Sequence, residues 1–170
     1  TSEPWGSVYC DDTSSVSRIF DSRLSYAKGA MVLNMLRFKI GDSAFFERKK
    51  NYITDPLLVY GYADTYDFKA HAEAASGTNL TDFFNDWIYN QGYPIYTLNS
   101  TIHADSSVSI NFLQSQSHAS VSFFKLPVPV RFADAFSDTT IIFNNNQNNQ
   151  TFDIHLNFFP TQITFDPEKE

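Results

Sequence analysis

The hydrophobic periodicity of the sequence changes at Pro94, and this change constrains the fold more than any other feature. Before Pro94, apolar residues recur at spacings of three and four, which is the period of a buried helical face. After Pro94 they alternate with polar residues, as in strands whose successive side chains point to opposite faces. We therefore expect an α+β chain, with a helical part at residues 1–94 and a β domain at residues 95–170.

The helical part divides into four segments bounded by capping residues and turn signals. Asp21 or Ser22 can begin the first segment by accepting backbone N–H bonds, and Gly41 can end it. Its predicted buried face consists of Ala30, Leu33, Leu36 and Ile40. The other three segments are expected to begin at Asp42 or Ser43, at Thr65, and at Thr78 or Asn79, and to end before Pro56, at Gly77 and at Gly92.

The β part contains about seven short alternating segments separated by Ser, Asn, Asp and Pro, a pattern typical of an antiparallel β-sandwich. Pro127 and Pro129 lack the N–H that a sheet ladder uses, so their strand is expected to be an edge or to carry a bulge. The Asn-rich tract 144–150 is expected to be a hairpin tip. The expected strands cover residues 95–102, 108–112, 119–124, 128–132, 139–143, 152–156 and 163–165.

The charge and composition exclude several classes of protein. A formal charge of −7, with only 12 scattered Lys and Arg residues, argues against a nucleic-acid partner. No apolar run approaches the roughly 18 to 20 residues of a membrane helix. The first residue is Thr1 and not methionine, which favours a fragment of a longer protein, with a processed mature chain as the alternative. Abundant Ser, Thr and Asn with acidic charge favours an exported or secreted protein, and the scarcity of cysteine leaves the cytoplasm as the alternative.

A search for reactive groups gives few candidates. The sequence lacks a Gly-x-Ser-x-Gly elbow, a phosphate-binding glycine loop and a paired-cysteine metal site. Its four histidines include no His-x-x-x-His pair, and we interpret each of them, His71 included, as a surface residue. Cys10 precedes Asp11 and Asp12, whose charges disfavour a thiolate. We assign no metal-binding or cofactor-binding residue in this chain, and interpret Glu73 as an exposed helix carboxylate.

Tyr26 stands out because it occupies the first turn of a predicted helix and is followed at i+3 and i+4 by Gly29 and Ala30. Small residues on that face allow another backbone to come close. By pattern alone, a tyrosine on an apolar helix face is most often a core residue.

A wider pattern around Tyr26 changes this interpretation. Tyr26-Ala27-Lys28-Gly29-Ala30, with the apolar residues and Gly41-Asp42 that follow, strongly resembles the Tyr-x-Lys-Gly-Ala/Ser helix of the aminopeptidase N family of zinc metallopeptidases. The resemblance extends over about residues 20–98. It continues through Phe45-Phe46, Tyr52, Glu73, Ser76-Gly77, Leu80, Phe83-Phe84, Trp87 and Gly92-Tyr93-Pro94.

The resemblance implies that residues 1–94 are the helical C-terminal part of a thermolysin-like catalytic domain. It also implies a zinc ion held by a His-Glu-x-x-His helix and a later glutamate, none of which is in this chain. Tyr26 then corresponds to the catalytic tyrosine, whose neutral phenol donates a hydrogen bond to the oxyanion of the tetrahedral intermediate. Lys28 and Gly29 are expected to position the helix and not to react.

The function that the resemblance implies is hydrolysis of N-terminal residues from peptides by the full-length enzyme. Its partners are a peptide substrate and the upstream half of the same catalytic domain, while the fragment alone is expected to bind no catalytic zinc and to cleave nothing. The alternative is a non-catalytic scaffold or peptide-binding protein derived from the same family. A secreted carbohydrate-binding sandwich is a third and weaker possibility.

Overall fold

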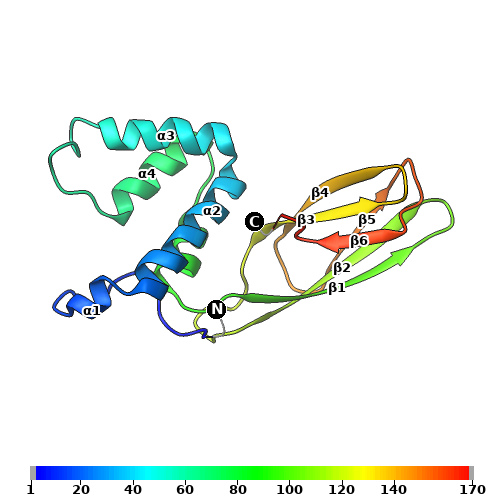
Figure 1. Cartoon of the computed structure of the whole chain (residues 1–170), viewed down its shortest axis with the longest axis horizontal. Helices are drawn as coiled ribbons and strands as arrows, with labels where there is room; N and C mark the ends of the chain where they lie inside the picture. Colours follow the sequence, from blue (N-terminus) through cyan, green and yellow to red (C-terminus); the bar gives the residue numbers. More distant parts are fainter. Residues whose placement is uncertain (1–2, 169–170) are drawn as a thin grey trace. The chain divides into compact units, whose positions relative to one another are not determined.

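The computed structural model describes residues 3–168, apart from the side chains of residues 48 and 49. The chain divides into two compact units, one formed by Trp5–Gln91 and one formed by Gly92–Glu170 with Glu3 and Pro4. The first unit is helical and the second consists of antiparallel strands (Figure 1). The α+β class predicted from the sequence is confirmed.

The ends of the helices follow the capping residues closely. Gly41 ends one helix and Gly77, in the left-handed conformation with φ 64°, ends another, as predicted. The helix that ends at Gly77 is capped at its start by Asp64, and not by Thr65 as predicted, because the Asp64 side chain accepts hydrogen bonds from the Tyr66 and Asp67 amides. The helical segments are α1 (Val16–Ile19), η1 (Ser22–Lys28), α2 (Gly29–Ile40), α3 (Asp42–Thr54), α4 (Thr65–Ser76), α5 (Thr81–Phe84) and η2 (Asn85–Tyr89), where η marks π-helical hydrogen bonding.

The predicted buried face of the first helical segment is only partly correct. Leu36 is buried, but Leu33 is 44% exposed and Ala30 is also exposed. Val32 is buried instead, at 2% exposure, because α2 packs against η1, α3 and η2 through a face rotated by about one residue from the predicted one. Periodicity identifies which residues are apolar, but it cannot tell which neighbour covers them.

Two polar residues of α4 are structural and not simply exposed, contrary to the prediction. Glu73 Oε1 accepts a 2.7 Å hydrogen bond from the amide of Leu80, which is completely buried beside the start of α5. His71 Nε2 lies 3.0 Å from Asp55 Oδ2, and both side chains are largely buried. Glu73 therefore satisfies a backbone donor that the short helix α5 cannot satisfy itself.

The β unit contains two three-stranded antiparallel sheets, with strand orders β1-β2-β5 and β4-β3-β6. Side chains from both sheets form one core, in which Ile110 and Phe112 of β2 contact the cluster containing Val130 and Phe132 of β3. All four side chains are fully buried. The strands are β1 (Pro94–Ile102), β2 (Ser107–Gln116), β3 (Leu126–Ala133), β4 (Asp138–Asn145), β5 (Gln150–His155) and β6 (Gln162–Phe165).

The predicted strand at residues 119–124 is wrong, although Val121 and Phe124 within it are buried. The side chain of Gln114 holds this segment in place of a strand ladder. Its Oε1 accepts from the Phe124 amide at 2.8 Å and its Nε2 donates to the Phe124 carbonyl at 2.9 Å. One buried amide group thus imitates the two bonds that a neighbouring strand would supply.

The prolines of β3 fall where that strand has a single neighbour among the described residues. Strand β3 is central, because β4 and β6 flank it. Its pairing with β6 starts only at Val130, whereas Pro127 and Pro129 pair with β4 alone. The prediction of an edge strand is wrong for β3 as a whole but correct for the part that carries the prolines, where no ladder donor is lost.

The described helices are short, and none combines the length and apolar character that crossing a membrane requires.

Candidate active site

Asp21 fixes the turn that carries Tyr26. Its carboxylate accepts hydrogen bonds from the amides of Arg23 (2.9 Å) and Leu24 (2.7 Å), which are unpaired donors at the start of η1. Its backbone carbonyl accepts from Ser25 (2.9 Å) and Tyr26 (3.4 Å), giving the π-helical pattern. The Leu24 amide, followed by that of Arg23 and the nearby guanidinium groups, holds the pKa of Asp21 below its usual range.

Tyr26 is not a core residue in this structure. Its side chain is 58% exposed, whereas Leu24 on the same helix is 6% exposed. It lines a cavity of about 640 Å³ within the helical unit. The cavity walls include Val8, Tyr9, Leu33, Phe68 and Phe84. Tyr26 is thus a polar group at the edge of a largely apolar hollow, an arrangement typical of binding sites.

Lys28 lies on the side of η1 that faces the N-terminal segment. Its Nζ donates a 3.1 Å hydrogen bond to the carbonyl of Gly6. Burial, and secondarily the charge of Arg23, lowers the pKa of Lys28. The expectation that Lys28 positions the helix and does not react agrees with a side chain already used in a structural contact.

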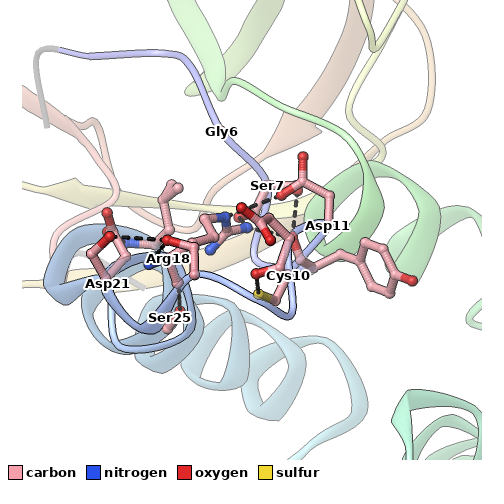
Figure 2. A network of polar contacts seen from close by, with 12 residues as sticks. Gly6, Ser7, Cys10, Asp11, Arg18, Asp21 and Ser25 are labelled. Atoms are coloured by element: carbon pink, nitrogen blue, oxygen red, sulfur yellow. Dashed lines mark hydrogen bonds and ion pairs between the residues drawn. The ribbon is translucent and has the colours of Figure 1, made fainter.

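Arg18 is the centre of a polar network between α1 and the N-terminal segment (Figure 2). Its Nε lies 3.2 Å from Asp11 Oδ1, and its Nη2 donates to the carbonyls of Ser7 and Tyr9. Nη1 is buried without a partner among the described residues. Figure 2 shows the Arg18 side chain extending from the Asp21 and Ser25 side of the network toward Ser7 and Asp11.

This N-terminal segment could not be predicted from the sequence, because backbone carbonyls that accept hydrogen bonds leave no residue pattern. The only signal was Gly6, which adopts φ +89°. Cys10 also lines the cavity, and its Sγ lies 3.4 Å from the carbonyl of Asp12. The structure therefore brings Tyr26 together with Val8, Tyr9 and Cys10, which lie 16 to 18 positions earlier in the chain.

The part of the chain that the structure describes contains no group of three His, Cys, Asp or Glu side chains arranged to hold a metal ion. Glu73 accepts a hydrogen bond from the Leu80 amide, and His71 lies beside Asp55. Neither of these contacts involves Tyr26. The described residues therefore do not fit the zinc ion that the family resemblance implies.

Comparison with known proteins places the helical unit in a family. The family model described as the peptidase family M1 domain matches residues 2–87, which is about half of the chain. Aminopeptidase M1-B of Oryza sativa subsp. japonica is 38% identical over 88 residues, covering 52% of this chain and 10% of that protein. Aminopeptidase N of Lactococcus lactis subsp. lactis is 33% identical over 82 residues, covering 47% of this chain and 9% of that protein.

The resemblance in fold extends through the β unit. Aminopeptidase A of Legionella pneumophila, solved in complex with aspartic acid, matches with a TM-score of 0.71. The match covers 89% of this chain and 17% of that one, at 16% sequence identity. The chain spans about a tenth of the length of the curated relatives named above. Since the family model covers the segment from the N-terminal loop through η2, the chain belongs to peptidase family M1.

Proposed function

We propose that this chain is part of a zinc-dependent aminopeptidase, in which Tyr26 stabilises the transition state of peptide-bond hydrolysis. The observation that carries the proposal is the position of Tyr26. It is 58% exposed, it opens onto a cavity, and it belongs to the segment matched by the family model.

Tyr26 is suited to donate a hydrogen bond to an oxyanion. The attacked carbonyl oxygen becomes negatively charged in the tetrahedral intermediate, and a preorganised neutral donor stabilises that charge. Asp21 supplies the preorganisation, because it holds the first turn of η1 through four hydrogen bonds to Arg23, Leu24, Ser25 and Tyr26. Loss of one such donor costs about 10²- to 10³-fold in rate, or about 2.7–4 kcal/mol.

The zinc ion and its ligands are proposed to belong to the remainder of the protein. The described residues of this chain offer no group that could hold a metal. The proposed role of Tyr26 accordingly involves only its own hydroxyl group and the developing oxyanion. In this proposal the chain contributes the hydroxyl donor and the helical turn that holds it. The metal, the general base and the residues that recognise a free N-terminus belong to the remainder of the protein.

The surface of the helical unit supports a partner within the same polypeptide. Met31, Leu33 and Phe46 are 51%, 44% and 51% exposed, and α1 adds Val16 at 71%. Apolar side chains exposed in such numbers are typical of a unit that packs against another polypeptide. Relatives of family M1 are about ten times longer than the matched region, so they contain ample chain for that purpose. We infer that the upstream half of the same catalytic domain covers part of these exposed side chains.

The test uses the full-length protein with a fluorogenic aminoacyl amide substrate. Tyr26→Phe removes one hydroxyl group and is expected to lower kcat by about 10²- to 10³-fold, with KM changed only a few-fold. Tyr62→Phe is the matched control, since Tyr62 is fully exposed in the loop before α4 and its change should leave kcat unaltered.

Two outcomes would contradict the proposal. Near-normal turnover by the Tyr26→Phe variant would remove the tyrosine from the mechanism. Absence of any aminopeptidase activity in the correctly folded wild-type protein would favour the alternative, a scaffold or peptide-binding protein derived from the family.

A further inference from the structure

The segment Trp5–Tyr9, which we name the strap, is bound by three cationic side chains, two from η1, the helix that carries Tyr26, and one from α1. Arg23 Nη1 donates to the Trp5 carbonyl at 2.8 Å, and Lys28 Nζ donates to the Gly6 carbonyl at 3.1 Å. Arg18 Nη2 donates to the carbonyls of Ser7, at 3.1 Å, and of Tyr9. Four backbone carbonyls in five residues thus accept charge-assisted hydrogen bonds, which are stronger than bonds between neutral groups.

The opposite side of the strap is bound to the end of η2. The Gly6 amide donates to Gln91 Oε1 at 2.8 Å, and the Tyr9 amide donates to the Ile88 carbonyl at 2.9 Å. The rings of Tyr9 and Tyr89 are 5.3 Å apart between centroids. The strap is therefore bound on both sides within the helical unit, although loops with exposed backbone groups are ordinarily mobile.

Packing of the strap against η1 is close at one point. A Cβ atom on Gly6 would lie 2.5 Å from Leu24 Cδ1, and Leu24 is itself 6% exposed. The positive φ of Gly6 makes a side chain there strained as well. The backbone of the strap thus approaches the helix as closely as glycine allows.

The strap forms a wall of the cavity that Tyr26 lines. Val8 and Tyr9 of the strap line this cavity. Ser25 and Tyr26 of η1 and Gly29 of α2 line it as well. We propose that Lys28, together with Arg18 and Arg23, is a positioning residue that fixes the strap as a wall of the substrate-binding cavity beside Tyr26. The proposal rests on the proposed function and deepens it, because it names residues that shape substrate binding without contacting the oxyanion.

Because Tyr26 and Lys28 have different proposed roles, their substitutions are expected to change different kinetic constants. Tyr26 would act on the transition state alone, so its loss lowers kcat. Lys28 acts through a wall that contacts the substrate in both the ground state and the transition state. Its loss therefore raises KM and leaves kcat nearly unchanged.

The experiment compares Lys28→Met, Lys28→Arg and the control Lys50→Met in the full-length protein. Lys28→Met keeps the length of the side chain and removes the donor to the Gly6 carbonyl. We expect KM to rise about tenfold, as for the loss of one charge-assisted hydrogen bond, with kcat within about twofold of wild type. Lys28→Arg restores a cationic donor and is expected to return KM to within about threefold of wild type. Lys50 is exposed on α3, and its substitution should change neither constant.

Hydrogen exchange provides a second readout that does not depend on turnover. The Gly6 and Tyr9 amides are bonded to Gln91 and Ile88, so they should exchange slowly in the wild-type protein. Their exchange should accelerate about tenfold in Lys28→Met and remain slow in Lys50→Met, with the η1 amides of Leu24 and Ser25 unchanged.

Several results would overturn the inference. It is wrong if Lys28→Met lowers kcat with KM unchanged, if it alters neither KM nor amide exchange, or if Lys28→Arg behaves like Lys28→Met. Failure of the proposed function looks different, because Tyr26→Phe would then keep normal kcat while the KM effect at Lys28 persisted. A wild-type protein without activity would overturn both the substrate-binding role of the strap and the proposed function.

Discussion

The β unit and the helical unit of this chain bury their apolar side chains to very different degrees. In the β unit, Phe112 and Phe132 are completely buried in a core shared by both sheets. In the helical unit, Leu36 and Leu80 are equally buried, but Leu33 and Phe46 on neighbouring helices are 44% and 51% exposed. Most of the exposed large apolar side chains among the described residues belong to the helical unit.

The difference shows that the β unit closes its own core, whereas the helical unit leaves many apolar side chains uncovered. The helical unit has the larger share of apolar residues, so a shortage of apolar side chains does not explain its open packing. The two units differ in how many of their apolar faces are covered by helices or strands of the same unit. Two sheets close on each other, whereas short helices of low amphipathic regularity need neighbours on more than one side. This agrees with a helical unit that is proposed to dock onto the remainder of the catalytic domain.

The largest expected effect on stability tests the closed core. Phe112→Ala should destabilise the chain by about 3–5 kcal/mol, since it removes a fully buried aromatic side chain and leaves a cavity. Phe46→Ala makes the same change at a half-exposed position of α3 and should cost far less. Urea unfolding of both variants measures the difference. Equal destabilisation would show that the helical unit is as well packed as the β unit.

An intermediate effect should appear at high pH. Burial raises the pKa of Tyr96 to about 12, whereas an unfolded tyrosine titrates near 10. Between these values the folded state retains a proton that the unfolded state releases, so stability is complete below pH 10 and falls as pH rises toward 12. Tyr96→Phe should remove this alkaline loss of stability in the β unit, while Tyr62→Phe, at an exposed position, should not.

The Tyr96→Phe variant also has a cost at neutral pH. The Tyr96 hydroxyl accepts a 2.8 Å bond from Gln114 Nε2, and Gln114 is 4% exposed. Leaving that buried donor unpaired should lower stability by about 1–3 kcal/mol. The pH dependence is therefore measured as the slope of unfolding free energy against pH, and a wild-type slope unchanged by the substitution would contradict the assignment to Tyr96.

The smallest expected effect on stability concerns Leu33, one of the exposed apolar residues of the helical unit. Leu33→Ser should change the unfolding free energy of the present chain by less than about 0.5 kcal/mol, because Leu33 is already 44% exposed. It should also reduce the binding of an apolar dye. In the full-length protein the same substitution should destabilise by more than 1 kcal/mol if a neighbour covers Leu33. A negligible effect in both contexts would show that this face is never buried.

The sequence allowed the local features to be predicted better than the packing. The ends of helices at Asp21, Gly41 and Gly77 were correct, because caps are determined by residues within one turn. The buried face of α2 was wrong at Leu33, because burial depends on which elements lie alongside. The strand expected at 119–124 was wrong because the long-range contact from Gln114 replaces pairing there.

The candidate site shows the same division between local and distant information. Tyr26 could be singled out from the motif that follows it, and its role remains a prediction. The strap could not be found, because its carbonyls carry no side-chain signature and its donors at Arg18, Arg23 and Lys28 look like ordinary surface cations. The π-helical form of η1 was also missed, since the Asp21 carbonyl that produces it gives no pattern in the sequence.

The close approach of Gly6 to Leu24 restricts which substitutions position 6 can accept during evolution. A side chain at position 6 would meet the end of the Leu24 side chain at 2.5 Å, so Gly6 cannot be exchanged freely while Leu24 remains. A lineage that replaces Gly6 would first need a smaller residue at position 24, and would still have to tolerate the strained backbone. Among related sequences, a residue other than glycine at position 6 should therefore occur only together with a smaller residue at position 24.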